Sequence, residues 1–369
     1  MKYYLKQIQK YFAYFIIFII FAYILGFICR AEQVKSLSNI VITNVLDTNI
    51  YFIAKKDTNS VRNILILRKE TDKQKVFEFK NEYKFSENVI DLKQCPIADS
   101  GYFILSELTR FKELNIQLIG LSPATKYFID FFSLNKKGKI SGEIKSINFL
   151  TLAAEPINQA SQIAFKNTTD SSISMTWSNG SGYGRIILVR KDTFPSFPKD
   201  GIVYVQNSSY GDLHSQIDNN GTYIVGNFTK YNSNNLTVTK LGYGNYYFQV
   251  FEYNGENENI NYLLKSGFYN PRSKYTSLPT PKAFPATDIT ADGFTANWSE
   301  IQGAETFLIE IATDENFQSL IDIYNPADVG PICNLQIIEL KPKTKYFLRV
   351  RAVGKESRSE YSNIISVQL

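Results

Sequence analysis

The chain has 369 residues, of which 44% are hydrophobic and 20% are charged, with a formal net charge of +5. Aromatic residues make up 14%, against 20 Gly and 12 Pro in the whole chain. This composition excludes a wholly disordered, collagen-like or low-complexity protein and favours strands, in two to four domains. With one His and three Cys, we expect no metal site and no cofactor.

The positive charge is concentrated at the N-terminus. Residues 1–31 contain Lys2, Lys6, Lys10 and Arg30 and no acidic residue, so the remainder carries only +1. So small an excess does not neutralise a phosphate backbone. The sequence therefore predicts no nucleic-acid binding.

Residues 1–31 have the pattern of a signal peptide or an N-terminal membrane anchor. The lysines precede an uncharged stretch of 19 residues over 11–29, and the small-x-small site at Cys29–Ala31 would allow cleavage. A hydrophobic helix of that length would also just span a bilayer, so both alternatives stay open. In each case the body lies outside the cytoplasm. We expect a secreted or cell-surface protein that contacts a membrane only through 11–29, if uncleaved.

Two heptapeptides mark an internal repeat. Leu121–Tyr127 (LSPATKY) and Leu340–Tyr346 (LKPKTKY) share the pattern L-x-P-x-T-K-Y, and each continues into a strand of alternating polarity.

Two cysteines, Cys95 and Cys333, follow residues 1–31 and fall in different repeats. We therefore expect two isolated thiols and no disulfide bond between them.

The middle copy of this repeat is Leu241–Val250 (LGYGNYYFQV). Counting from the leucine selects Tyr247 as the corner residue, whereas the alternation of Tyr246, Phe248 and Val250 selects Tyr246. A one-residue slip would bury Gln249. We therefore assign Tyr246 and expect Gln249 on the outer face.

A second repeated feature lies upstream of each heptapeptide. Strands are predicted at 173–178 and 294–299, where they contain Trp177 and Trp298, and at 50–54, which has no Trp. Further strands follow, and the first two copies carry an extra stretch between their middle strands. Short strands, turn residues and repeats of domain length predict tandem antiparallel β-sandwiches.

The Trp-bearing strand, the L-x-P-x-T-x-Y corner and the run Arg349–Ala352 (RVRA) resemble fibronectin type III domains. The resemblance implies an all-β chain of three immunoglobulin-like sandwiches, of the kind found in exported bacterial proteins. The first copy is divergent and enlarged, the second is enlarged, and the third is the closest match; their predicted ranges are 36–152, 156–278 and 281–369. The predicted core signature consists of Trp177, Trp298, Leu121, Tyr127, Leu241, Tyr246, Leu340 and Tyr346.

Three motifs could be mistaken for reactive or ligand-binding sites. The glycine run Gly180–Gly184 (GSGYG) is followed at once by a strand, which favours a turn over a phosphate-binding loop. His214 has no nucleophile motif around it and is interpreted as a loop residue. Asp314–Asn316 lacks the spacing of a calcium loop and is interpreted as a solvated turn. No catalytic, cofactor-binding or metal-binding residue is therefore predicted.

Five tyrosines cluster in the enlarged part of the second copy. They are Tyr183, Tyr204, Tyr210, Tyr223 and Tyr231. If their rings were exposed, they could stack on sugars or on a protein partner. Packing against neighbouring strands is the favoured interpretation.

These features favour a non-catalytic exported or cell-surface protein that binds, adheres or acts as a spacer through its tandem sandwiches. Its expected partner is a protein or a cell-surface polysaccharide. The alternative is an accessory carbohydrate- or polymer-binding part of an extracellular enzyme system. A catalytic enzyme comes third, because no set of acid, base and nucleophile can be named.

Overall fold

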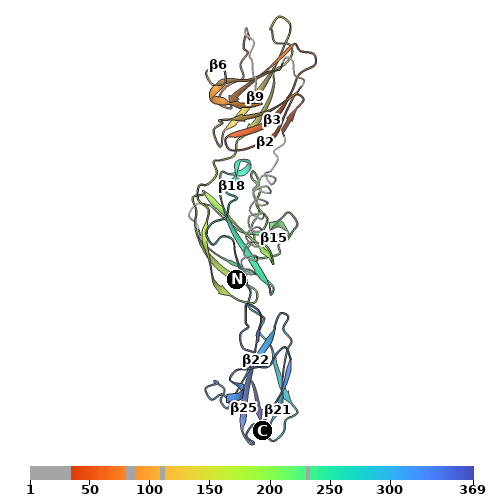
Figure 1. Ribbon diagram of the computed structural model, residues 1–369, viewed down its shortest axis with the longest axis vertical. Coiled ribbons are helices and arrows are strands. Elements are labelled where there is room, and N and C mark those ends of the chain that lie inside the picture. Colours follow the sequence, from red (N-terminus) through yellow and green to blue (C-terminus); the bar gives the residue numbers. More distant parts are fainter. Residues whose placement is uncertain (1–34, 80–87, 109–112, 230–232) are drawn as a thin grey trace, which may run out of the picture.

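The computed structural model describes residues 35–79, 88–108, 113–229 and 233–369. The predicted signal or anchor over 1–31, with its hydrophobic helix, lies outside these residues. The described residues form six β-sheets that pack in pairs around three main hydrophobic cores. Figure 1 shows these pairs following one another along the long axis of the molecule. We call them the first, second and third sheet pair.

The first sheet pair has one sheet in the order β1-β2-β3-β8-β5 and one in the order β10-β9-β4-β7-β6. All pairings are antiparallel except that of β5 with β8. The elements are β1 (Lys35–Leu37), β2 (Ile40–Val45), β3 (Asn49–Lys55), β4 (Arg62–Lys69), β5 (Val89–Asp91), the 3₁₀ turn η1 (Leu92–Gln94), β6 (Ile97–Asp99), β7 (Tyr102–Leu108), β8 (Glu113–Ile119), β9 (Lys126–Leu134) and β10 (Lys145–Leu150).

The second sheet pair places β11-β12-β16 against a six-stranded sheet in the order β14-β15-β13-β17, in which β17 also pairs with both β18 and β19. The elements are β11 (Ser161–Thr168), β12 (Ile173–Ser178), β13 (Gly184–Lys191), η2 (Leu213–Ser215), β14 (Gln216–Ile217), β15 (Thr222–Thr229), β16 (Asn235–Val238), β17 (Asn245–Asn254), η3 (Asn257–Asn259), β18 (Asn261–Tyr262) and β19 (Arg272–Tyr275).

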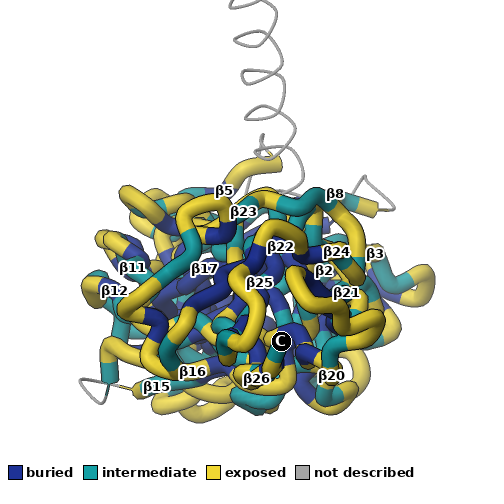
Figure 2. The backbone as a smooth tube through the Cα atoms, turned by 90° about the horizontal axis from the view of Figure 1, so that it is seen from below, coloured by how far each residue is buried: buried dark blue, intermediate teal, exposed yellow. Residues whose placement is uncertain are grey.

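The third sheet pair is the smallest, with sheets β20-β21-β24 and β23-β22-β25-β26. The elements are β20 (Ala283–Thr287), β21 (Phe294–Trp298), β22 (Thr306–Ala312), η4 (Asp322–Tyr324), β23 (Ala327–Asp328), β24 (Asn334–Ile337), β25 (Lys345–Val353) and β26 (Ile365–Gln368). Seen from below in Figure 2, buried residues lie in the interior while exposed residues concentrate at the periphery.

The residues of the predicted core signature are all buried, in the cores of the three sheet pairs. Each corner tyrosine accepts a hydrogen bond from a backbone amide just before its strand. Tyr127 Oη accepts from Ser122 N at 3.0 Å, Tyr246 Oη from Gly242 N at 3.1 Å and Tyr346 Oη from Lys341 N at 2.8 Å. The hydroxyl thereby fixes the loop that enters the strand, while the ring fills the core.

The extra stretches of the first two copies cover the outer face of a sheet. They contribute to a second cluster beside the main core of each pair, which includes Phe79 and Tyr102 in the first and Ile217 and Tyr262 in the second. For this reason β4 and β13 are buried along most of both faces.

The expected exposure of one face of β17 is wrong. Tyr246 is the core residue and Gln249 lies on the outer face, as predicted, but that face is covered and Gln249 is only 3% exposed. Phe251 and Tyr253 on the same strand belong to the outer cluster that covers this face. Alternation gave the correct register but could not show that a second layer buries the outer side chains as well.

The linker between the first and second sheet pairs is hydrogen-bonded to both. Leu152 N donates to Leu46 O at 3.1 Å, and Ala153 N donates to Asn259 O at 2.8 Å. The amide of Asn261 donates to Ala153 O at 2.7 Å. These bonds attach the linker to both neighbours over consecutive residues.

The second and third sheet pairs meet through Tyr243. Its ring packs against the core of the third pair, and its hydroxyl lies 3.5 Å from Gly303 O. Leu278, in the linker, is buried in that same core. Within the described part of the chain, no helix is long and apolar enough to cross a membrane.

Candidate binding groove

The glycine run predicted as a turn is a turn, and its amides are occupied by a carboxylate of the protein itself. Gly180 N and Gly182 N each donate to a different oxygen of Glu252, both at 2.9 Å. A Cβ on Gly182 would lie 2.7 Å from the same carboxylate. The turn therefore binds an internal anion, and the close approach explains its glycines.

Arg185 completes this cluster from the adjacent strand. Its Nε donates to Glu252 Oε1 at 2.9 Å, and the two side chains are 3% and 0% exposed. A buried carboxylate needs this many partners, because desolvation of the charge is costly unless it is paired and hydrogen-bonded. The cluster is structural: it joins β13, β17 and the turn between β12 and β13.

His214 and Asp314 lie in surface turns. The side chain of His214 is 89% exposed and its Nδ1 lies 3.3 Å from Asp212 Oδ1. Asp314 accepts from the backbone amides of Asn316, Gln318 and Ser319, and these bonds lower the pKa of its carboxyl. Among the described residues, no group of three or more His, Cys, Asp or Glu could hold a metal ion.

The tyrosine cluster divides between two packed layers. Tyr210 contacts Tyr223 and Tyr246, with ring centroids 4.6 and 5.1 Å apart, next to the main core. Tyr183 and Tyr204 pack against the outer cluster. Tyr231 lies outside the described residues. These four rings pack within the protein, as the favoured interpretation expected.

Both described cysteines are free. Cys95 is buried in the core of the first sheet pair, and burial raises the pKa of its thiol to about 11. Cys333 packs against the core of the third pair and is less buried, with a pKa that burial also raises.

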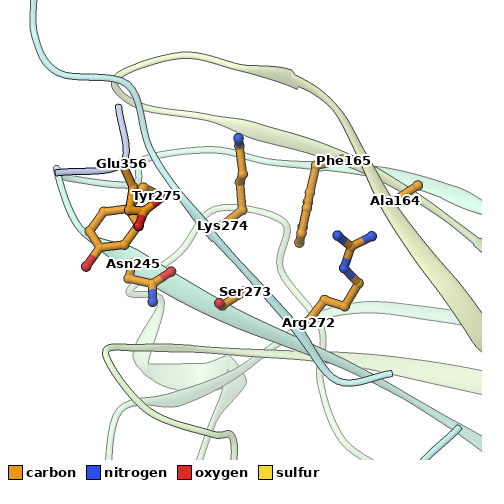
Figure 3. Close-up of a pocket in the computed structure, with 8 residues that line it drawn as sticks. All are labelled: Ala164, Phe165, Asn245, Arg272, Ser273, Lys274, Tyr275 and Glu356. Atoms are coloured by element: carbon orange, nitrogen blue, oxygen red, sulfur yellow. The ribbon is translucent and has the colours of Figure 1, made fainter. Parts of the chain in front are cut away.

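A pocket of about 620 Å³ opens between β11 and β19, the facing edge strands of the second sheet pair. That volume is within the range of small-ligand sites. We call it the β11–β19 groove; Figure 3 shows the residues that line it, Ala164, Phe165, Asn245, Arg272, Ser273, Lys274, Tyr275 and Glu356. Glu356 comes from the third sheet pair, so the groove lies where the second and third pairs meet.

The two strands are bridged beyond each end of the groove. Ile163 N donates to Tyr269 O at 3.2 Å on one side, and Ser277 N donates to Thr169 O at 2.9 Å on the other. Between these bridges β11 and β19 do not pair with each other. The groove is therefore a gap of limited length in the side of the sandwich.

Charged and polar groups around the groove lack partners. Lys274 and Glu356 form no ion pair or side-chain hydrogen bond among the described residues. Arg272 donates through Nη1 to Ile163 O at 2.7 Å but pairs with no described carboxylate. The Oδ1 atom of Asn245 is buried without a hydrogen-bond partner among the described residues, an arrangement that costs free energy.

Two exposed aromatic rings extend the groove at its Arg272 end. Phe268 and Tyr269 are 67% and 57% exposed, with ring centroids 4.1 Å apart. The guanidinium of Arg272 lies 5.3 Å from the centre of the Tyr269 ring and 5.7 Å from that of Phe165. The aromatic rings and the cation thus form one continuous surface.

The turn that carries these rings is held from beneath by Asn270. Its buried side chain accepts from Val250 N at 3.0 Å and donates to Val250 O at 2.8 Å and Ala160 O at 2.9 Å. A Cβ on Gly267 would lie 2.2 Å from Ala160 O, so only glycine permits this approach. The aromatic pair is therefore displayed on a fixed support.

The same position in the third sheet pair has a different lining. A pocket of about 610 Å³ there, beside β20 and β26, has no charged residue in its wall, which includes Pro285, Ala286, Ile289 and Ile364. The shared fold therefore accounts for a gap at this edge but not for the charged and aromatic groups of the β11–β19 groove.

No sequence motif indicated this groove. Its residues come from four separate segments, 164–165, 245, 272–275 and 356, and no motif joins them. The available signal was Phe268-Tyr269 beside Gly267 and Pro271, two adjacent aromatics within a turn sequence.

No protein-family model and no curated protein matches this chain. Solved structures with a similar fold include a two-domain fibronectin type III segment of chicken tenascin, at 11% identity and a TM-score of 0.34, covering 57% of this chain and 99% of that one. The chicken CNTN1 FN1–FN3 domains are 12% identical with a TM-score of 0.26, covering 89% and 97%. FN3tt is 23% identical with a TM-score of 0.22, covering 25% and 95%. These similarities concern the fold alone.

Proposed function

We propose that this chain, a tandem fibronectin type III-like protein, is a non-catalytic binding and spacer protein of the cell exterior. Each sheet pair is then one domain, and the predicted ranges 36–152, 156–278 and 281–369 divide the chain accordingly. The signal-like or anchor-like sequence of residues 1–31 supports the location. A protein or a cell-surface polysaccharide is the partner.

The observation that carries the spacer role is the way the sheet pairs are joined. Consecutive linker residues bond to both neighbours at the first junction, and Tyr243 packs into the next core at the second. Each junction thereby limits bending, since motion requires breaking these contacts. A line of joined sandwiches holds a binding surface away from its point of attachment.

Small-angle scattering on residues 35–369 tests this role. We expect an extended particle of roughly 100 Å, because sandwich strands of up to ~10 residues rise ~3.3 Å each and three units follow in line. A compact particle would contradict the spacer role.

Fractionation and N-terminal sequencing of the full chain in its native host test the location. Mature protein that begins near Glu32 outside the cytoplasm would support a signal peptide, and intact Met1 in membranes would support an anchor. Soluble cytoplasmic protein with Met1 intact would contradict the proposed location.

A second candidate function is polymer binding as an accessory to an extracellular enzyme system. The β11–β19 groove favours it, because exposed aromatic rings beside unpaired polar groups are the features with which proteins hold amphipathic, hydroxylated ligands.

A further inference from the structure

We propose that the β11–β19 groove binds an acidic polysaccharide, a chain of sugar rings that carry carboxylate groups. This inference rests on the proposed binding function and assigns it a site and a ligand class. It uses the charged groups that line one pocket and the exposed rings that lie beside it.

The cations of the groove account for the acidic character of the ligand. Lys274 and Arg272 both line the pocket, and neither pairs with a described carboxylate. Arg272 is partly oriented by its bond to Ile163 O, which leaves other N–H groups of its guanidinium for a ligand. A ligand carboxylate would receive charge-assisted hydrogen bonds here, which are stronger than neutral ones.

An acceptor of the groove accounts for hydroxyl groups on the ligand. The Glu356 carboxylate is exposed and has no ion-pair or hydrogen-bond partner among the described residues. A simple anion would leave Glu356 without a donor and would meet it with like charge. A sugar hydroxyl can donate to Glu356 while the carboxylate of the ligand faces the cations.

The exposed rings account for a chain of several sugars. Phe268 and Tyr269 lie beyond the pocket at the Arg272 end, on the turn that Asn270 fixes. The C–H face of a sugar ring is apolar and can cover an aromatic ring. Because the support is rigid, little conformational freedom is lost when a ligand packs on it.

An extended peptide fits the groove less well. A peptide that adds to a sheet needs a free run of backbone groups along an edge. Here the Arg272 side chain crosses to Ile163 O, and backbone bonds join the two strands beyond each end of the gap. These bridges interrupt both edges where an added strand would have to continue.

Calorimetric titration of residues 35–369 with polygalacturonate oligomers tests the proposal. We expect binding that weakens with salt, no binding of neutral dextran oligomers, and at most weak binding of polyglutamate. Lys274→Gln should weaken polygalacturonate binding by about tenfold, the effect of one charge-assisted hydrogen bond. Lys282→Gln, an exposed lysine in the third sheet pair, is the matched control and should bind as the parent does.

Phe268→Ala separates recognition from folding. It removes a ring that is 67% exposed, so the variant should be as stable as the parent, yet it should bind polygalacturonate several-fold more weakly. Polyglutamate binding of equal strength would assign the groove to peptides or to anions in general and overturn the proposal. So would unchanged binding in both groove variants. Absence of polygalacturonate binding by an extended particle would overturn this inference and leave the spacer function standing.

Discussion

The ring of Tyr243 lies so close to Gly303 that a Cβ on this glycine would be 2.1 Å from Tyr243 Cε1. Gly303 also has a φ of +90°, a backbone conformation that other residues rarely adopt. The two residues belong to different sheet pairs, so this contact defines the second junction.

Gly303→Ala should therefore destabilise the third sheet pair and loosen the junction. The positive φ alone costs about 1–2 kcal/mol, and the clash with Tyr243 adds to it. Gly330→Ala is the matched control, because Gly330 has a φ of +72° and nothing within 4 Å of its added Cβ. In a Trp177→Phe background, where Trp298 is the remaining tryptophan, denaturation followed by fluorescence measures the free energy of unfolding, and scattering measures the junction. Equal losses of unfolding free energy in both variants would show that the Tyr243 contact contributes nothing to stability.

The two tryptophans provide a second comparison. Trp177 Nε1 donates to Asn179 Oδ1 at 2.8 Å, whereas Trp298 Nε1 is buried with no hydrogen-bond partner in the described part of the chain. Both substitutions by Phe lose core volume, but only Trp177→Phe also breaks a hydrogen bond. We expect it to cost about 1 kcal/mol more than Trp298→Phe. Each variant keeps one of the two Trp of the chain, and that Trp lies in the sheet pair that is not altered. Unfolding of the altered sheet pair should therefore be followed by circular dichroism. A larger loss of stability in Trp298→Phe than in Trp177→Phe would contradict the contribution assigned to the hydrogen bond of Trp177.

Glu252→Gln should strongly destabilise the second sheet pair. The substitution removes the charge that Arg185 faces and leaves a single oxygen to accept from two glycine amides. Breaking a buried pair of this kind costs about 3–5 kcal/mol. Urea denaturation followed by Trp177 fluorescence in a Trp298→Phe background measures the change in the free energy of unfolding. Glu360→Gln, at an exposed position, should stay within about 0.5 kcal/mol of the parent, and a similar result for Glu252→Gln would contradict the role of the cluster.

The two thiols should differ in reactivity. Burial raises the pKa of Cys95 to about 11 and leaves Cys333 more accessible, so iodoacetamide at pH 8 should modify Cys333 first. Because the Cys95 pKa is higher in the folded state than the ordinary thiol value of about 8.5, its contribution to stability is present at neutral pH and is lost as pH rises toward 11. Mass spectrometry of timed digests measures the order. Faster modification of native Cys95 would place it outside the core.

The sequence determined the principal strands and their core faces because both depend on local periodicity. Alternation assigned Tyr246 to the core, and the heptapeptides at Leu121–Tyr127 and Leu340–Tyr346 located two further corners. A motif of seven residues can indicate such a corner because the tyrosine hydroxyl accepts a hydrogen bond from a backbone amide only a few positions away. The glycine run Gly180–Gly184 was likewise identified as a turn from the strand that follows it.

Only the tertiary structure decided what surrounds these elements. The burial of Gln249, the carboxylate of Glu252 in the glycine turn, and the approach of Tyr243 to Gly303 all join residues far apart in the chain. The β11–β19 groove likewise combines Phe165, Asn245 and Lys274 with Glu356. Such contacts depend on which sheet edges face each other and which layer covers a strand, and periodicity within one strand carries no information about either.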